Sequence, residues 1–100
     1  MIRVVRVGQG SQEILSRPLT KAVRVGFTFL RPGQNVGRHT TGDNEEVIVV
    51  LRGRGLLEAD GLEHELSEGC VAYVGPRTEH DILNVGDGPL AYIYVVASSE

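Results

Sequence analysis

The sequence is divided into short apolar runs by glycine and polar clusters, and this division constrains the fold more than any other feature. Glycine makes up 13 of the 100 residues, and pairs typical of tight turns, such as Asp60-Gly61 and Gly75-Pro76, separate the runs. No window of about a dozen residues keeps the i, i+3, i+4, i+7 apolar spacing of an amphipathic helix. The pattern predicts many short strands and no long helix.

The apolar runs mark the places where we expect strands. They cover Ile2–Val7, Ala22–Leu30, Val36–Thr41, Glu46–Leu51, Gly55–Ala59, Leu62–Leu66, Cys70–Val74, His80–Asn84 and Leu90–Ala97. Between the first two, Ser11–Leu15 is expected to form one helical turn capped by Ser11. Short strands at such regular spacing predict an all-β sandwich or small barrel, and the length predicts a single domain over residues 1–100.

Two of these runs, Val47–Leu51 and Ala91–Val96, are apolar on both faces. In a strand, successive side chains point to opposite faces, so one face of each run can line the barrel interior. The other face must then pack against a second sheet or a second subunit. We therefore expect a homodimer.

Charge and hydropathy argue against two classes of partner. The formal net charge is −3 and there is no basic run, which argues against nucleic-acid binding. No apolar run approaches the roughly 20 residues of a transmembrane helix, and the first residues do not resemble a signal peptide. The lone Cys70 cannot form an intrachain disulfide. We expect a cytoplasmic protein that binds no membrane.

Two of the three histidines and one glutamate are candidate metal ligands. Glu46 is on the same face of its strand as the apolar side chains that follow it, and a carboxylate buried there needs a partner. That partner is either a metal ion or an arginine such as Arg24 or Arg38. With His39 and His80, each from another strand, Glu46 would complete a facial triad of ligands.

The spacing around these residues carries a family resemblance. Gly33 is followed after five residues by His39-Thr40-Thr41, after four more by Glu46, and after six more by Gly53. This resembles the first motif of the cupin superfamily, whose pattern is Gly, five residues, His-x-His, three or four residues, Glu, six residues, Gly. The anchors match except the second histidine, which is Thr41 in this chain.

A second stretch resembles the second cupin motif. Gly69, His80 and Asn84 occupy its Gly, His and Asn anchors, whereas Pro76 falls one place late and Arg77 stands where a second Gly is usual. Together the two motifs span residues 33–53 and 69–84. The resemblance implies a double-stranded β-helix, a jelly-roll cupin barrel of two antiparallel sheets.

The resemblance also implies a site inside that barrel. It makes His39, Glu46 and His80 the ligands of a divalent transition metal ion, with Fe, Mn, Ni, Zn and Cu equally compatible. Thr41 stands at the fourth ligand position, and a hydroxyl is a poor ligand, so the metal is also expected to be weakly bound or absent. Further pocket candidates are Thr41, Asn84 and Tyr92, although Asn84 also fits a purely structural role at a strand end.

Several functions remain open from the sequence. The first is a metal-dependent oxygenase or an isomerase or lyase that acts on a small polar molecule, with no catalytic residue assigned. The alternative is a non-catalytic cupin that binds a small molecule and has a degenerate metal site. A weaker third is a metal-free epimerase that would use a histidine with Tyr92.

Two further reactive side chains are interpreted as structural. His64 is expected on the surface of its strand, and Cys70 is expected to be a small buried hydrophobe.

Overall fold

The computed structural model of the protein describes residues 1–98 and places nine strands in them. They are β1 (Gln12–Leu15), β2 (Val23–Leu30), β3 (His39–Thr40), β4 (Glu45–Arg52), β5 (Arg54–Ala59), β6 (Leu62–Ser67), β7 (Val71–Val74), β8 (Glu79–Asn84) and β9 (Leu90–Ala97). No helix occurs among the described residues. The all-β prediction is confirmed.

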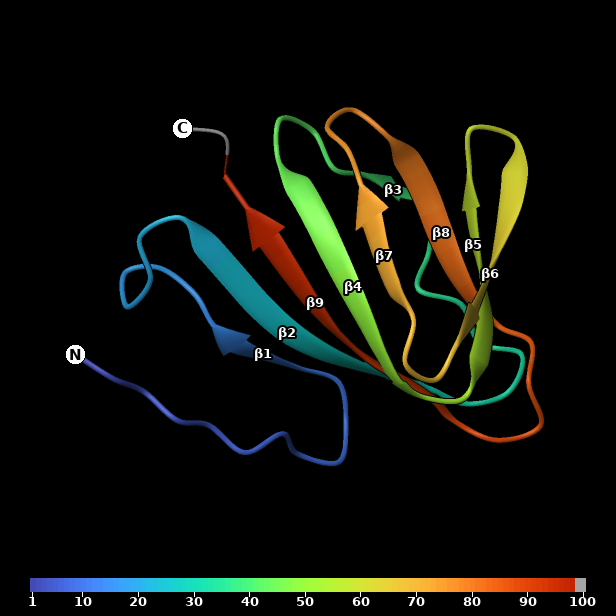
Figure 1. Ribbon diagram of the computed structural model, residues 1–100, viewed down its shortest axis with the longest axis horizontal. Coiled ribbons are helices and arrows are strands. Elements are labelled where there is room, and N and C mark those ends of the chain that lie inside the picture. Colours follow the sequence, from blue (N-terminus) through green and yellow to red (C-terminus); the bar gives the residue numbers. More distant parts are fainter. Residues whose placement is uncertain (99–100) are drawn as a thin grey trace.

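The strands form two antiparallel sheets that face each other as a jelly-roll barrel (Figure 1). One sheet has the order β1-β2-β9-β4-β7 and the other the order β3-β8-β5-β6. The two sheets converge where β4 ends and β5 begins, and they diverge toward the end where β4 and β8 begin. We call these the closed end and the open end of the barrel.

Alternation along the strands places the core between the sheets. Ile48 and Val50 of β4 are 0% and 1% exposed, and Ile82 of β8 is 2% exposed. The buried cluster draws on both sheets and consists of Leu30, Ile48, Val50, Leu57, Leu66, Val74, Ile82, Leu90 and Tyr92. Each burial of such an aliphatic side chain stabilises the fold by about 1.5–3 kcal/mol. The same alternation buries Glu46 and His80 at the open end of this core and Asn84 at its closed end.

Three expectations about local structure are wrong. Ile2–Val7 forms no strand, because apolar alternation builds a strand only where a neighbouring backbone accepts its hydrogen bonds. Ser11–Leu15 contains no helical turn, since Gln12–Leu15 pairs with β2 as the edge strand β1. Val36–Thr41 is reduced to β3, because the backbone N–H of Gly37 bonds the side chain of Asp81 at 2.8 Å instead of a strand neighbour.

The strands that are apolar on both faces, β4 and β9, lie side by side in the larger sheet. Ile48, Val50, Leu90 and Tyr92 on their inner face are buried, and outer residues such as Val49 and Ile93 are half-buried in the single chain. The homodimer expected from this second apolar face stays a prediction. Among residues 1–98 there is no helix long and apolar enough to cross a membrane.

Candidate metal centre

The three predicted ligands come together at the open end of the barrel from three different strands. His39 of β3 and His80 of β8 are directly opposite each other in the antiparallel register, so their side chains lie on one face. Their ring centroids are 4.2 Å apart. Glu46, at the head of the inner face of β4, completes the group, in which one ligand atom from each residue lies within 4.8 Å of the others. The group could hold a metal ion.

Backbone carbonyl groups orient both imidazole rings. His39 Nδ1 lies 2.8 Å from the carbonyl oxygen of Gly37, and His80 Nδ1 lies 3.0 Å from that of Thr78. A carbonyl oxygen only accepts hydrogen bonds, so each Nδ1 carries the proton that is donated. Each Nε2 is thereby left as the nitrogen available to a metal, and metal-binding histidines usually donate their other ring N–H to a backbone carbonyl or a carboxylate in this way.

Glu46 and His80 form a buried pair. Their side chains are 10% and 1% exposed, and Oε1 of Glu46 lies 3.1 Å from Nε2 of His80. A carboxylate oxygen and an unprotonated Nε2 are both acceptors, so this contact requires a proton or a cation between them. The geometry therefore suits exchange of one proton for a metal ion. Among residues 1–98 no arginine pairs with Glu46, so the arginine partner considered above is absent there.

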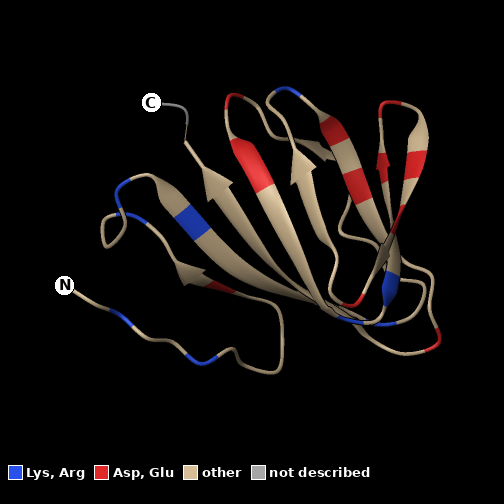
Figure 2. Ribbon diagram, viewed as in Figure 1, with Lys and Arg blue, Asp and Glu red and all other residues tan. Residues whose placement is uncertain are grey.

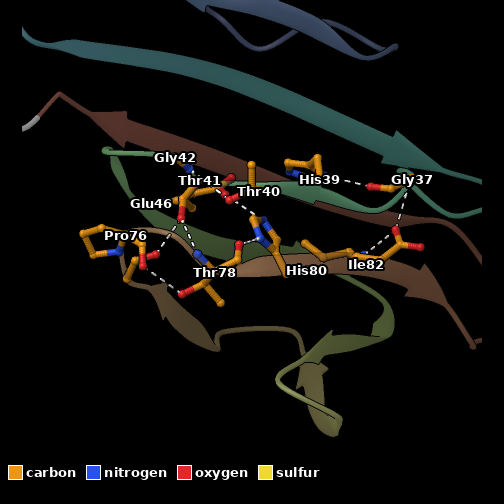
Figure 3. A network of polar contacts seen from close by, with 12 residues as sticks. Gly37, His39, Thr40, Thr41, Gly42, Glu46, Pro76, Thr78, His80 and Ile82 are labelled. Carbon is orange, nitrogen blue, oxygen red and sulfur yellow. Dashed lines mark hydrogen bonds and ion pairs between the residues drawn. The ribbon is translucent and has the colours of Figure 1, made fainter.

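Thr41 at the fourth ligand position is used structurally (Figure 3). Its hydroxyl donates a hydrogen bond to the Gly75 carbonyl at 2.6 Å and accepts one from the Thr78 backbone N–H at 3.1 Å. These bonds connect the turn before β4 to the turn before β8, and these are the strands that carry Glu46 and His80. Thr41 thus holds the two ligand-bearing strands together.

His39, Glu46 and His80 line a cavity of about 470 Å³ between the sheets. Thr41 and Tyr92, two of the predicted pocket residues, line it. Burial raises the pKa of the Tyr92 phenol to about 12, although a hydrogen bond with Thr28 acts in the opposite direction. The phenol is therefore a protonated hydrogen-bonding group at neutral pH and not a base.

Asn84 does not line this cavity. It is 1% exposed at the closed end, and its amide donates to the carbonyls of Leu30 and Gly88 while its oxygen accepts the N–H of Gly86. His64 lies exposed on β6, outside the ligand group.

The sequence offered Arg24 only as an ion-pair partner for Glu46 and did not assign Tyr94 to either face of its strand, whereas both residues line the cavity. The available signal was the alternation Arg24, Gly26, Thr28 along one face of β2. That alternation shows which residues share a face, but it does not show that the face is turned into the barrel. The pairing of β2 with β9 supplies that information.

Comparisons with known proteins agree with this fold. Residues 26–96 match the family described as the cupin domain. The chain is 29% identical, over 89 residues, to an uncharacterized protein of Methanocaldococcus jannaschii, spanning 87% of this chain and 71% of that protein.

Solved structures show the same fold. A predicted oxalate decarboxylase of Thermotoga maritima superimposes with a TM-score of 0.82 at 26% identity, covering 88% of this chain and 78% of the other. A cupin protein of Bacteroides fragilis superimposes with a TM-score of 0.84 at 24% identity, covering 97% of this chain and 84% of the other.

Proposed function

The chain belongs to the cupin domain family, and from this premise we propose that it binds a divalent transition metal ion through His39, Glu46 and His80. The adjoining cavity would take a small polar molecule, which is the ligand or substrate. The ion would be held by three protein groups, leaving further coordination positions for that molecule.

One observation carries this proposal. Two imidazole rings, each oriented by a hydrogen bond from its Nδ1 to a backbone carbonyl, lie with a buried carboxylate in a group in which one ligand atom of each residue is within 4.8 Å of the others. A pair of structural histidines would have no need for matching orientation toward one carboxylate. The donor set of two imidazoles and one carboxylate fits Fe, Mn, Ni, Zn or Cu.

The bound ion would supply Lewis-acid or redox chemistry, which corresponds to an isomerase or lyase in the first case and an oxygenase in the second. The chain's own residues would position the ligand. The Tyr92 phenol, protonated up to a pH of about 12, would donate or accept a hydrogen bond in the cavity. Glu46 would be occupied as a ligand and would not act as a base.

The alternative is a cupin that binds its small molecule without catalysis. It is favoured by Thr41, whose hydroxyl is committed to the Gly75 carbonyl and the Thr78 N–H and so adds no ligand to the metal. The two functions differ in turnover. Oxygen consumption and isomerase and lyase assays on the metal-loaded protein would detect the enzyme and give no signal for the binding protein.

The metal proposal is tested by elemental mass spectrometry of purified protein, as isolated and after loading with each of the five metals. We expect about one metal ion per chain in the wild type and a loss of at least about tenfold in His80→Ala. His64→Ala is the matched control, because it removes an exposed histidine outside the ligand group, and it should keep the wild-type content. Absence of metal in the wild type after loading, or equal content in all three proteins, would contradict the proposal.

A further inference from the structure

An arginine of the neighbouring strand faces the same cavity as the metal centre. Arg24 of β2 and Glu46 of β4 are both directly opposite Val96 of β9, so all three side chains lie on the inner face of one sheet. Adjacent strands are about 4.8 Å apart, which places the Arg24 and Glu46 backbones about 10 Å from each other. Figure 2 shows the basic segment of β2 across the sheet from the acidic start of β4. Both residues line the cavity.

Tyr94 supports the Arg24 guanidinium. The guanidinium carbon lies 5.8 Å from the centroid of the Tyr94 ring, within cation–π distance. The ring can lie there because residue 26 is glycine, since a Cβ on Gly26 would be 2.1 Å from the Tyr94 hydroxyl and its ring carbon Cζ. The aromatic face orients the guanidinium while its positive charge stays uncompensated.

Arg24 has no acidic partner in the described structure. No carboxylate of residues 1–98 lies within ion-pair distance of it, whereas Arg38, the other arginine on the cavity wall, pairs with Glu79 at 3.3 Å. Among the described residues that line the cavity, Glu46 is the one carboxylate, and it faces His80. The cavity wall therefore presents one free cation beside the candidate metal ligands.

We propose that Arg24, seated on the ring of Tyr94, is the subsite that binds a carboxylate group of the ligand. A guanidinium offers paired N–H donors that match the two oxygens of a carboxylate, and hydrogen bonds between two charged groups are stronger than those between neutral ones. The ligand class is a small carboxylic acid that carries a second oxygen-bearing group a few ångströms away. That second group would reach the His39–Glu46–His80 cluster. The contact of the ligand with the metal centre rests on the proposed function, whereas its contact with Arg24 does not.

The test is isothermal titration of malonate, and of its uncharged diamide malonamide, into metal-loaded and metal-free protein. We expect malonate to bind the wild type, and Arg24→Gln to weaken its binding by about tenfold or more. Arg31→Gln is the charge-matched control, because Arg31 is exposed outside the cavity, and its affinity should stay within about twofold of the wild type. Arg24→Lys should lie between the wild type and Arg24→Gln, since it keeps the charge and loses the paired donors.

Three results would overturn the subsite. They are equal malonate affinity in wild type and Arg24→Gln, equal affinity of the wild type for malonate and malonamide, and no binding of malonate to the wild type. The metal content of each sample is measured in parallel. Failure of the wild type to hold metal would refute the metal proposal alone, because binding of malonate to the metal-free protein that depends on Arg24 would still support the subsite.

Discussion

The two ends of strand β8 use a buried polar residue in opposite ways. His80 at the open end and Asn84 at the closed end lie on the same face of the strand, and each is 1% exposed. At Asn84, backbone groups satisfy the whole amide, through donations to Leu30 and Gly88 and acceptance from Gly86, each at 2.9 Å. At His80, backbone satisfies Nδ1 only, and Nε2 is turned to Glu46 at 3.1 Å.

This difference separates stability from function within one strand. A buried polar group whose bonds all end on backbone fixes the path of the loops around it, and nothing remains for a ligand. A buried polar group whose last bond ends on another side chain can exchange that bond for one to an ion. The structure therefore predicts that disruption at the closed end lowers stability, whereas disruption at the open end lowers binding.

The largest effect on stability is expected for Asn84→Ala. The change leaves the buried Leu30 carbonyl and the loop groups of Gly86 and Gly88 without their partner, at a cost of about 3 kcal/mol. For a domain of this size this lowers the melting temperature by about 15 °C. His80→Ala should cost less, because the Glu46 carboxylate that loses its partner lines the cavity and can be hydrated there. Circular dichroism melts of the two variants test the comparison. A greater drop of the melting temperature in His80→Ala would contradict it, because the open end would then contribute more to stability than the closed end.

A smaller loss is expected from packing at the closed end. Gly53 and Gly33 both have left-handed backbone, with φ of 91° and 83°, so alanine costs about 1 kcal/mol at either position. A Cβ at Gly53 would also lie 2.2 Å from the backbone oxygen of Pro89, whereas a Cβ at Gly33 meets nothing within 4 Å. We expect Gly53→Ala to cost about 2 kcal/mol and Gly33→Ala about half as much, measured by urea unfolding. Equal losses would show that the closed end yields to the added methyl group.

Thr41→Val sharpens the comparison at the open end. Valine keeps the shape of threonine but loses the bonds to the Gly75 carbonyl and the Thr78 N–H, at a cost of about 1.5 kcal/mol. Metal content by elemental mass spectrometry should stay at the wild-type value, because Thr41 holds the ligand-bearing strands without being a ligand. Loss of metal in a folded Thr41→Val protein would instead show that metal binding needs the hydroxyl, either as a ligand or through the two strands that it connects.

What the sequence could predict follows from the range of each interaction. Alternation within one strand correctly placed Glu46 with Ile48, and family spacing brought His39 and His80 to the same site. Alternation could not show that Arg24 faces the cavity, because that depends on register with β9, far along the chain. For the same reason Ile2–Val7 had a strand pattern without a strand.

The smallest expected effect concerns Tyr92, which lines the cavity between the two ends of the barrel. Its pKa is raised to about 12 by burial, against 10 in the unfolded chain, so the folded protein keeps a proton that the unfolded chain loses. Its contribution to stability is therefore complete below pH 10 and is lost as the pH rises toward 12. The part already lost at pH 10.5 is about 0.8 kcal/mol of unfolding free energy.

Urea unfolding of the wild type and Tyr92→Phe between pH 8 and about 11 measures this contribution. The slope of the difference reports the net titration of the phenol, which already includes the opposing effect of its hydrogen bond with Thr28. Tyr73, whose pKa is raised by its hydrogen bond to Glu45, is present in both proteins and cancels. Parallel pH profiles would mean that water from the open end reaches the phenol. A steeper decline of the unfolding free energy in the wild type would show that Tyr92 belongs to the dry interior of the barrel and that water entering from the open end does not reach it.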